Sequence, residues 1–387
     1  MIVPPWAGLL APLEEFTRLH AATLRRFGHR AIDLSFPNPR FLSDPRPYRT
    51  LADLAARSGP VDLRYSPFGG FTPVRRRIAA ALSRQHQLPY QRGDIIMTPG
   101  ASAALAVVFG ALFPHSDRIV VPTPCWMDYP LYLAHAGIGC DLAPGTIDKR
   151  LDLAAIEAAW TPRTRGLVIS QPVSPTGVVH NNHELAQLAA LLHRVGAQHG
   201  NLPLLIADEA HCQQAWARSP CPAPASHYAN TVTVRSVTKG WDMQGQRTGY
   251  LAVSPHFRSQ APVSQLLEHY MRASGHCAPT ALMQHLAAAL SDTHPDVTGL
   301  GELQRHARCA LAQRGVEVVD AAATRFLYAR CPIPDDRTFV ARLADRGVLT
   351  MPSSIFHEPG WFRLALNIAQ PELDRAIDII AEEATDV

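Results

Sequence analysis

The chain has 387 residues, enough for a large and a small domain, and its 47% hydrophobic and 18% charged content is typical of a soluble globular protein. The formal charge is only +3, and the basic residues are scattered, which argues against a nucleic-acid or membrane-surface partner. The seven cysteines are widely spaced without a C-x-x-C pair, so they indicate neither zinc nor disulfides but a reducing, cytoplasmic location.

The N-terminal residues MIVPPWAGLLAPLEEF lack the basic segment of a signal peptide, and no apolar run reaches the roughly 18 residues of a membrane span. Residues 8–28 have apolar positions at helical spacing and predict an N-terminal arm. A short strand and turn follow at 31–41. The turn YSPFGG at 65–70 then precedes a helix predicted over 73–87, which begins at a proline.

Two strand–turn units come next. The first, IIMTPGASAALAVVFGALF at 95–113, predicts a strand, a turn and an apolar helix, with Gly100, Ala101 and Ser102 offering N–H groups at the helix start. Such a helix N-terminus suits a phosphate group. The second, at 118–130, predicts a buried strand that ends in P-T-P-C-W, which contains Trp126. That tryptophan can cover a ligand ring or belong to the core.

The central third carries two more strands with polar ends. The segment GLVISQPVSPTGVVH at 166–180 contains Ser174, and LPLLIADEAHCQQ at 202–214 contains Asp208 and His211. Further on, helices are predicted over 258–272 and 277–314, and a strand over 316–332. Near the C-terminus, WFRLALN at 361–367 places Arg363 in an apolar strand, where a guanidinium needs an anionic partner.

The segment TVTVRSVTKGWDMQGQRTGY at 231–250 carries the strongest chemical signal. A short strand leads to Ser236, Thr238 and Lys239, and Arg247 follows between two glycines. Hydroxyls, backbone N–H groups and a guanidinium together bind phosphate, and a lysine can form a Schiff base with a carbonyl. A phosphorylated aldehyde would use all of these groups, which describes pyridoxal phosphate. The eighteen histidines form no ligand pair with a carboxylate, so no metal site is predicted.

The pattern S-x-[ST]-K followed by G-x-R-x-G resembles the cofactor-lysine segment of pyridoxal-phosphate enzymes of fold type I, the class I/II aminotransferase family. The turn at 65–70, P-T-P-x-W, P-T-G, D-E-A-H and W-x-R-L occur in that family's order. The resemblance implies the aspartate aminotransferase-like α/β fold, with a mostly parallel seven-stranded sheet in a large domain and a smaller α+β domain. It divides the chain into an N-terminal arm at 1–45, a cofactor domain at 46–280 and a C-terminal small domain at 281–387.

The resemblance also implies roles for individual residues. Lys239 carries the cofactor and acts as the base at the substrate Cα, Asp208 pairs with the pyridine nitrogen, and Trp126 covers the ring. Arg363 holds the substrate carboxylate. Tyr65 reaches the cofactor phosphate of a partner chain, which implies a homodimer, although it can also pack at the interface without touching cofactor. The phosphate contacts within the chain are assigned to Gly100, Ala101, Ser102, Ser236, Thr238 and Arg247.

Three positions depart from the family pattern. Pro37 stands where the family has a glycine near the substrate carboxylate, so it is assigned to the substrate site. Ser174 replaces an asparagine and His211 a tyrosine, and both of those residues normally contact the phenolic oxygen of the cofactor. His211 can donate to that oxygen and can titrate near neutral pH, or it can be a satisfied histidine at a strand end.

We therefore predict an enzyme that acts on the Cα of an amino acid, with aminotransferase first. The paired changes at Ser174 and His211 make a lyase, cyclase or oxidase the alternative. A non-catalytic cofactor-binding sensor is a third hypothesis, although regulators of that kind carry a DNA-binding domain ahead of this fold. The substrate is not readable from the sequence. Residues 37–40 and a loop near Tyr129 and Tyr132 are expected to set it.

Overall fold

A seven-stranded sheet forms the centre of the computed structural model, which describes residues 4–40, 44–216, 221–257 and 262–385. Only β8 runs in the direction opposite to the other six strands, so the predicted, mostly parallel sheet is confirmed. In spatial order the strands are β2 (Ile95–Thr98), β8 (Gly249–Val253), β7 (Thr231–Ser236), β6 (Leu204–Asp208), β5 (Thr164–Ser170), β3 (Arg118–Thr123) and β4 (Gly139–Pro144).

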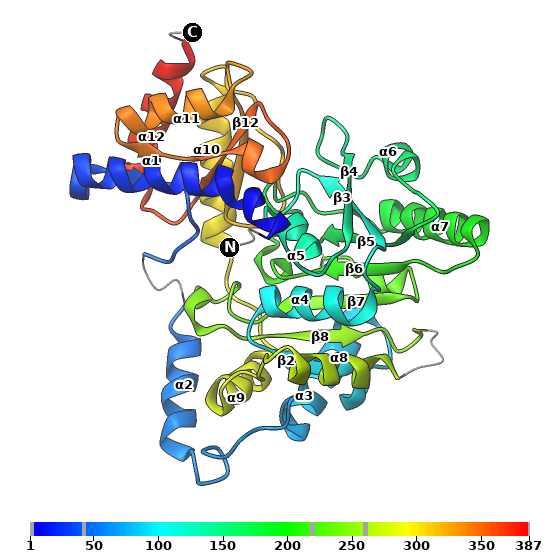
Figure 1. Ribbon diagram of the computed structural model, residues 1–387. Coiled ribbons are helices and arrows are strands. Elements are labelled where there is room, and N and C mark those ends of the chain that lie inside the picture. The colour runs from blue at the N-terminus through cyan, green and yellow to red at the C-terminus, as the bar shows by residue number, and fades with distance from the viewer. Residues whose placement is uncertain (1–3, 41–43, 217–220, 258–261, 386–387) are drawn as a thin grey trace.

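Both faces of this sheet are covered by helices, which is why its strands are nearly continuous apolar runs. Alternate residues point to opposite faces: Val168 and Ile206 pack in one cluster, and Leu167 and Leu205 in another. The first cluster includes α4 (Ala101–Leu112), α5 (Tyr129–His135) and α8 (Val263–Ala273), and the second includes α6 (Leu153–Ala158) and α7 (Asn182–His199). Figure 1 shows these helices on both sides of the strands.

The parallel strands bring their carboxyl ends to one edge of the sheet. There, β3, β5, β6 and β7 end at Thr123, Ser170, Asp208 and Ser236. In open α/β sheets, ligands bind just outside this edge. The segments that follow these strands carry Trp126, Ser174, His211 and Lys239, so these four predicted site residues come from the same edge of the sheet.

A second, smaller body lies above the large sheet in Figure 1. The antiparallel sheet of this body has the order β11 (Met351–Pro352), β12 (Trp361–Ala365) and β9 (Phe326–Arg330), and β1 (Ile32–Asp33) pairs in parallel with β10 (Val348–Leu349). Its helices are α1 (Ala11–Phe27), α10 (Thr298–Ala312), α11 (Asp336–Asp345) and α12 (Gln370–Thr385). One apolar cluster joins Phe16 and Leu34 to the C-terminal third, while the domain boundaries given above stay a prediction.

The remaining helices lie at the far end of the large sheet: α2 (Arg46–Arg57), α3 (Thr72–His86) and α9 (Ala281–Leu290). Two sequence expectations need correction. The stretch 277–314 forms two helices, α9 and α10, and only 326–330 of the strand predicted over 316–332 is a strand. Of the helix predicted over 258–272, the structure gives α8 from Val263, preceded by Pro262 outside the helix, while 258–261 lie outside the described residues.

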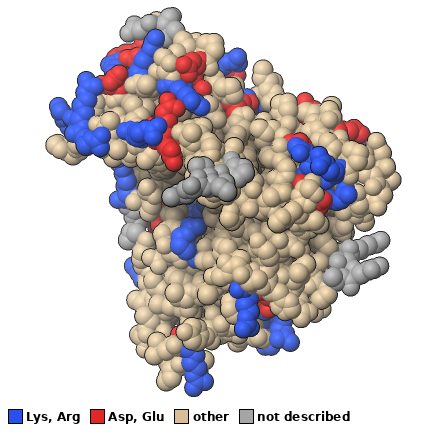
Figure 2. All heavy atoms as spheres, in the orientation of Figure 1, with Lys and Arg blue, Asp and Glu red and all other residues tan. Residues whose placement is uncertain are grey.

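Among the described helices, none has the length and apolar character to cross a membrane. Figure 2 shows acidic and basic side chains interspersed on the face in view, most densely over the smaller body. On that face they form no continuous basic surface.

Candidate active site

Lys239 follows β7 and lies beside the end of β6. Its Nζ is 3.0 Å from Nε2 of His211. Lys239 is half-buried and lines a cavity of about 290 Å³ between the large sheet and the smaller body. Burial lowers the pKa of Lys239; Arg247 and Arg363 lower it further, and Asp208 opposes them. The predicted site residues that line this cavity are Pro37, Trp126, Ser174, His211, Lys239 and Arg363.

Asp208 is held by its neighbours at the end of β6. The Tyr129 hydroxyl donates to Asp208 Oδ2 at 2.7 Å, and the Ala210 N–H donates to Oδ1 at 3.0 Å. Because Tyr129 donates to the carboxylate, the Ser170 hydroxyl, 2.8 Å away, donates to Tyr129. Burial raises the pKa of Asp208, whereas Lys239 and Tyr129 lower it. Tyr129 is 1% exposed, so it contributes to the site by holding Asp208.

A concave set of donors surrounds the start of α4. Gly100 has φ +88°, and a Cβ there would lie 2.7 Å from Nη2 of Arg247. A Cβ on Gly249 would lie 2.3 Å from the Arg235 carbonyl and 3.2 Å from the Ala101 nitrogen. Both glycines therefore let the guanidinium and strand β8 approach the helix N-terminus, where backbone N–H groups are unpaired by the helix.

The same corner also holds two hydroxyls and the start of the helix. Ser236 and Thr238 are buried with their oxygens 3.5 Å apart, and Ser236 accepts the Lys239 backbone N–H at 3.3 Å. Ala101 and Ser102 are the first residues of α4. Arg247 donates to the Gln244 carbonyl at 2.9 Å, and no carboxylate pairs with it in the described parts of the chain. Donors of this kind, with one guanidinium, suit a phosphate dianion.

Arg363 is buried without an acidic partner among the described residues. Nη2 of its guanidinium donates to the Ser35 carbonyl at 2.9 Å, and the rings of Phe326 and Phe356 lie 4.2 and 4.7 Å from its central carbon. Its Nε has no hydrogen-bond partner within the described chain. Burial lowers the pKa of Arg363 to about 9. A buried cation that faces a cavity in this way requires an anion from a ligand.

His211 and Ser174 occupy another side of the cavity. Nδ1 of His211 lies 2.8 Å from the Gln214 side-chain oxygen, and the Gln214 amide nitrogen donates to the Lys239 carbonyl at 2.9 Å. Burial, followed by the charge of Lys239, lowers the pKa of His211 well below its ordinary value. The expectation that His211 titrates near neutral pH was therefore wrong, since the ring stays neutral there.

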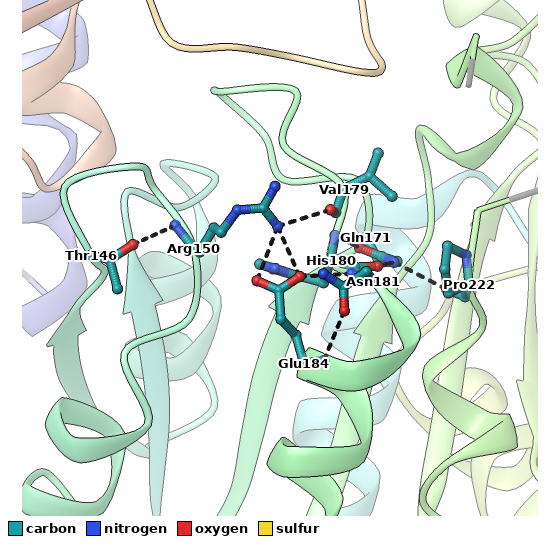
Figure 3. A network of polar contacts seen from close by, with 8 residues as sticks. All are labelled: Thr146, Arg150, Gln171, Val179, His180, Asn181, Glu184 and Pro222. Carbon is teal, nitrogen blue, oxygen red and sulfur yellow. Dashed lines mark hydrogen bonds and ion pairs between the residues drawn. The ribbon is translucent and has the colours of Figure 1, made fainter. Parts of the chain in front are cut away.

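The loop that carries Ser174 is closed by the polar network in Figure 3. The side chain of Gln171 donates to the His180 carbonyl at 2.8 Å and accepts the His180 N–H at 3.0 Å. Glu184 of α7 accepts the Asn181 N–H and pairs with Arg150, both at 2.8 Å. These contacts join the two ends of the loop without using the side chain of Ser174.

Tyr65 is not brought to the cavity by its own chain. Its side chain is fully exposed, and Leu63 and Val61 beside it are 86% and 62% exposed. Pro37 lines the cavity, and its carbonyl accepts from the Gln244 side chain at 3.2 Å.

Sequence reasoning missed several residues of the site. Gln214 contacts both His211 and Lys239. Arg325 lines the cavity and is ion-paired with Asp242. Asp128 is the one carboxylate among the described residues that line the cavity, and burial raises its pKa. No spacing rule marks them, because Gln214 and Arg325 act through contacts with Lys239 and Asp242, which lie far along the chain, and Asp128 is placed by the fold.

Comparison with known proteins agrees with this geometry. The family model "Aminotransferase class I and II" matches residues 30–380, and the chain belongs to this family of enzymes. Among curated relatives, an aspartate aminotransferase of Geobacillus stearothermophilus is 27% identical over 93% of both chains. An aspartate/prephenate aminotransferase of Thermus thermophilus is also 27% identical over 93% of both chains.

Solved structures with the same fold extend over nearly the whole chain. An aminotransferase from Eubacterium rectale matches with a TM-score of 0.92 at 21% identity, covering 100% of this chain and 99% of that one. The aspartate aminotransferase from Thermotoga maritima matches with a TM-score of 0.84 at 22% identity and 96% coverage of both. At these identities the likeness establishes the aspartate aminotransferase-like fold alone.

Proposed function

We propose that this protein is a pyridoxal-phosphate-dependent aminotransferase that acts on the Cα of an amino acid. The observation that carries the proposal is the placement of Lys239 between a buried carboxylate and two separate guanidinium sites. Arg247 lies at the phosphate-type corner, and Arg363 faces the cavity without an acidic partner within the described chain. An amino acid needs the second site for its carboxylate, and the cofactor needs the first.

The residues present fit this cofactor. The donor corner at Gly100, Ser236, Thr238 and Arg247 is suited to its phosphate, and the Lys239 amine to its aldehyde. Asp208 is a buried carboxylate whose two hydrogen-bond donors leave it able to hold a cationic ring nitrogen. Trp126 lines the same cavity and is assigned to the ring face. Bound there, pyridoxal phosphate supplies an electron-accepting ring that stabilises negative charge at the substrate Cα.

The protein groups divide the remaining work. Arg363 grips the substrate carboxylate, which orients the amino acid and limits which bond at Cα faces the ring. The Lys239 amine takes the proton from Cα, and its lowered pKa favours the neutral form that acts as a base. Asp208, supported by Tyr129, keeps a proton on the ring nitrogen. Phe36 and Phe326 give the cavity an apolar wall.

The names of the relatives support transamination over the lyase, cyclase or oxidase alternative. The changes at Ser174 and His211 remain unusual features of an aminotransferase site. We further propose a cytoplasmic homodimer in which Tyr65 contacts the partner's phosphate site. The exposed side chains of Val61, Leu63 and Tyr65 support an interface, because a cluster of apolar groups on one loop favours burial.

The test begins with purified protein, pyridoxal phosphate and borohydride. We expect a reduced adduct on Lys239, and its absence would overturn the proposal. Single amino acids are then added with and without a 2-oxo acid. Turnover that requires the 2-oxo acid supports aminotransferase. Turnover without it, with or without oxygen consumption, would instead establish the oxidase or the lyase and cyclase reactions.

A further inference from the structure

Lys239, His211 and Gln214 form a closed set of contacts whose hydrogen positions follow from elementary chemistry. The Lys239 carbonyl can only accept, so the Gln214 group 2.9 Å away must be its NH₂. The Gln214 oxygen then faces His211 Nδ1 at 2.8 Å and requires a proton on that nitrogen. A neutral ring with its proton on Nδ1 presents a lone pair at Nε2, which lies 3.0 Å from the Lys239 amine.

The opposite orientation of the Gln214 amide, with its oxygen toward the Lys239 carbonyl, is unfavourable. Turning the amide would place the Gln214 oxygen against the Lys239 carbonyl oxygen and leave two acceptors in contact. Gln214 is 1% and His211 7% exposed, so water cannot compensate for a lost hydrogen bond. The Phe326 ring also packs against His211 at 5.4 Å with a 67° angle between the planes, which limits reorientation of the imidazole.

The charges around the ring favour the same state. The charged groups that act on His211 are Lys239, Arg325 and Arg363, all cationic, and they disfavour a second proton on the imidazole. The groups that act on Lys239 are Asp208, Arg247 and Arg363. His211 therefore offers an acceptor at a place where a tyrosine would offer an O–H donor.

We propose that Gln214 is a positioning residue that keeps His211 in the Nδ1–H form, so that the Nε2 lone pair accepts a hydrogen bond from the Lys239 amine. The inference rests on the proposed function, because it assigns this task beside the lysine that captures the cofactor. Its consequence is that His211 partly offsets the lowering of the Lys239 pKa by burial and aims the amine, without itself carrying a charge.

The reactivity of Lys239 in the cofactor-free protein tests this role. The rate of pyridoxal phosphate capture, trapped by borohydride and assigned to Lys239 by mass spectrometry, is measured against pH and gives the apparent pKa of the amine. In Gln214→Met the Nδ1 proton loses its acceptor, and we expect this pKa to fall by roughly half to one unit, the equivalent of one hydrogen bond. In Gln214→Glu one carboxylate oxygen still accepts from Nδ1, while the donor to the Lys239 carbonyl is lost. Because the kept acceptor and the added negative charge both favour the ammonium form, the pKa should stay or rise.

The matched control is Gln213→Met, which changes the neighbouring glutamine, whose side-chain oxygen has no hydrogen-bond partner in the described chain. It should leave the apparent pKa unchanged. Equal pKa values in wild type and Gln214→Met would overturn the proposal, as would a lower value in Gln214→Glu. If wild-type Lys239 captures no cofactor at all, the proposed function fails instead.

A second measurement needs no cofactor. Nitrogen NMR of the cofactor-free protein with labelled histidine reports which ring nitrogen is protonated, and His211→Asn identifies the signal. We expect a neutral Nδ1–H ring at neutral pH. A proton on Nε2, or a charged ring, would overturn the assignment.

Discussion

The two ends of the proposed cofactor site are built in different ways. The corner near Gly100 consists of backbone N–H groups, two glycines, hydroxyls and one guanidinium, and its pattern follows the family closely. The side near His211 depends on the direction of side-chain hydrogen bonds, and two of its positions differ from that pattern. A site that binds a charged group through main-chain N–H groups is constrained by the backbone itself, so few substitutions are compatible with it. A site whose hydrogen-bond directions are set by side chains can be changed by single substitutions.

The largest effect, on capture of pyridoxal phosphate, is expected for substitution of Lys239, which lies between the two ends of the proposed cofactor site. Lys239→Ala should abolish borohydride-trapped capture of pyridoxal phosphate, because no other amine takes its place. Lys239→Arg keeps a positive charge and should also fail, which separates the amine from the charge. Mass spectrometry of the trapped protein measures both variants. An adduct on another residue in either variant would contradict the assignment.

The second largest effect is expected on substrate binding, which does not involve either end of the cofactor site. Arg363→Ala should lower kcat/KM for an amino acid by about 10²–10³, since a charged hydrogen-bonded contact contributes roughly 3–4 kcal/mol. Arg363→Lys should recover little, because lysine lacks the planar fork. Cofactor capture at Lys239 should be unaffected. A decrease in capture equal to the decrease in activity would show that Arg363 acts on the cofactor instead.

The phosphate corner is tested through its backbone. Gly100→Ala introduces a Cβ against Arg247 at a positive φ, so we expect the affinity for pyridoxal phosphate to fall about 10- to 100-fold, or roughly 1–3 kcal/mol. Gly245→Ala is the control, since a Cβ there meets nothing within 4 Å. Cofactor titration measures both. An equal loss of pyridoxal phosphate affinity in the two variants would show that close packing at Gly100 is not required for phosphate binding.

The smallest effect is on the stability of the cofactor-free protein. Burial raises the folded-state pKa of Asp208 above its unfolded value, so its contribution is favourable at low pH and is lost as pH rises through the folded pKa. At neutral pH the ionised carboxylate is a net cost, and Asp208→Asn should raise Tm by a few degrees. The same change should weaken cofactor binding. A lower Tm at neutral pH would show that the carboxylate is stabilised by its partners.

Much of the fold was predictable because the strands are distinct apolar runs that end in chemically marked residues. Lys239, Asp208 and Arg363 were predicted as site residues from such strand ends together with the family resemblance, since a charged group in or beside a buried strand needs a partner. The role of Gln214 could not be predicted from the sequence, because it depends on a hydrogen bond to the Lys239 carbonyl, 25 residues further along the chain. The contact of Tyr129 with Asp208 could not be predicted either, because it joins residues 79 positions apart in the sequence.

The clamp between Gln171 and His180 has a consequence for how such an enzyme diverges. Because the hairpin-like loop is closed at its base, the residue at its tip can be exchanged without rebuilding the surrounding backbone. A single codon change at 174 then reaches the reacting centre directly. In a fold arranged in this way, substitutions at such a position can change the reaction or substrate selectivity without disrupting folding.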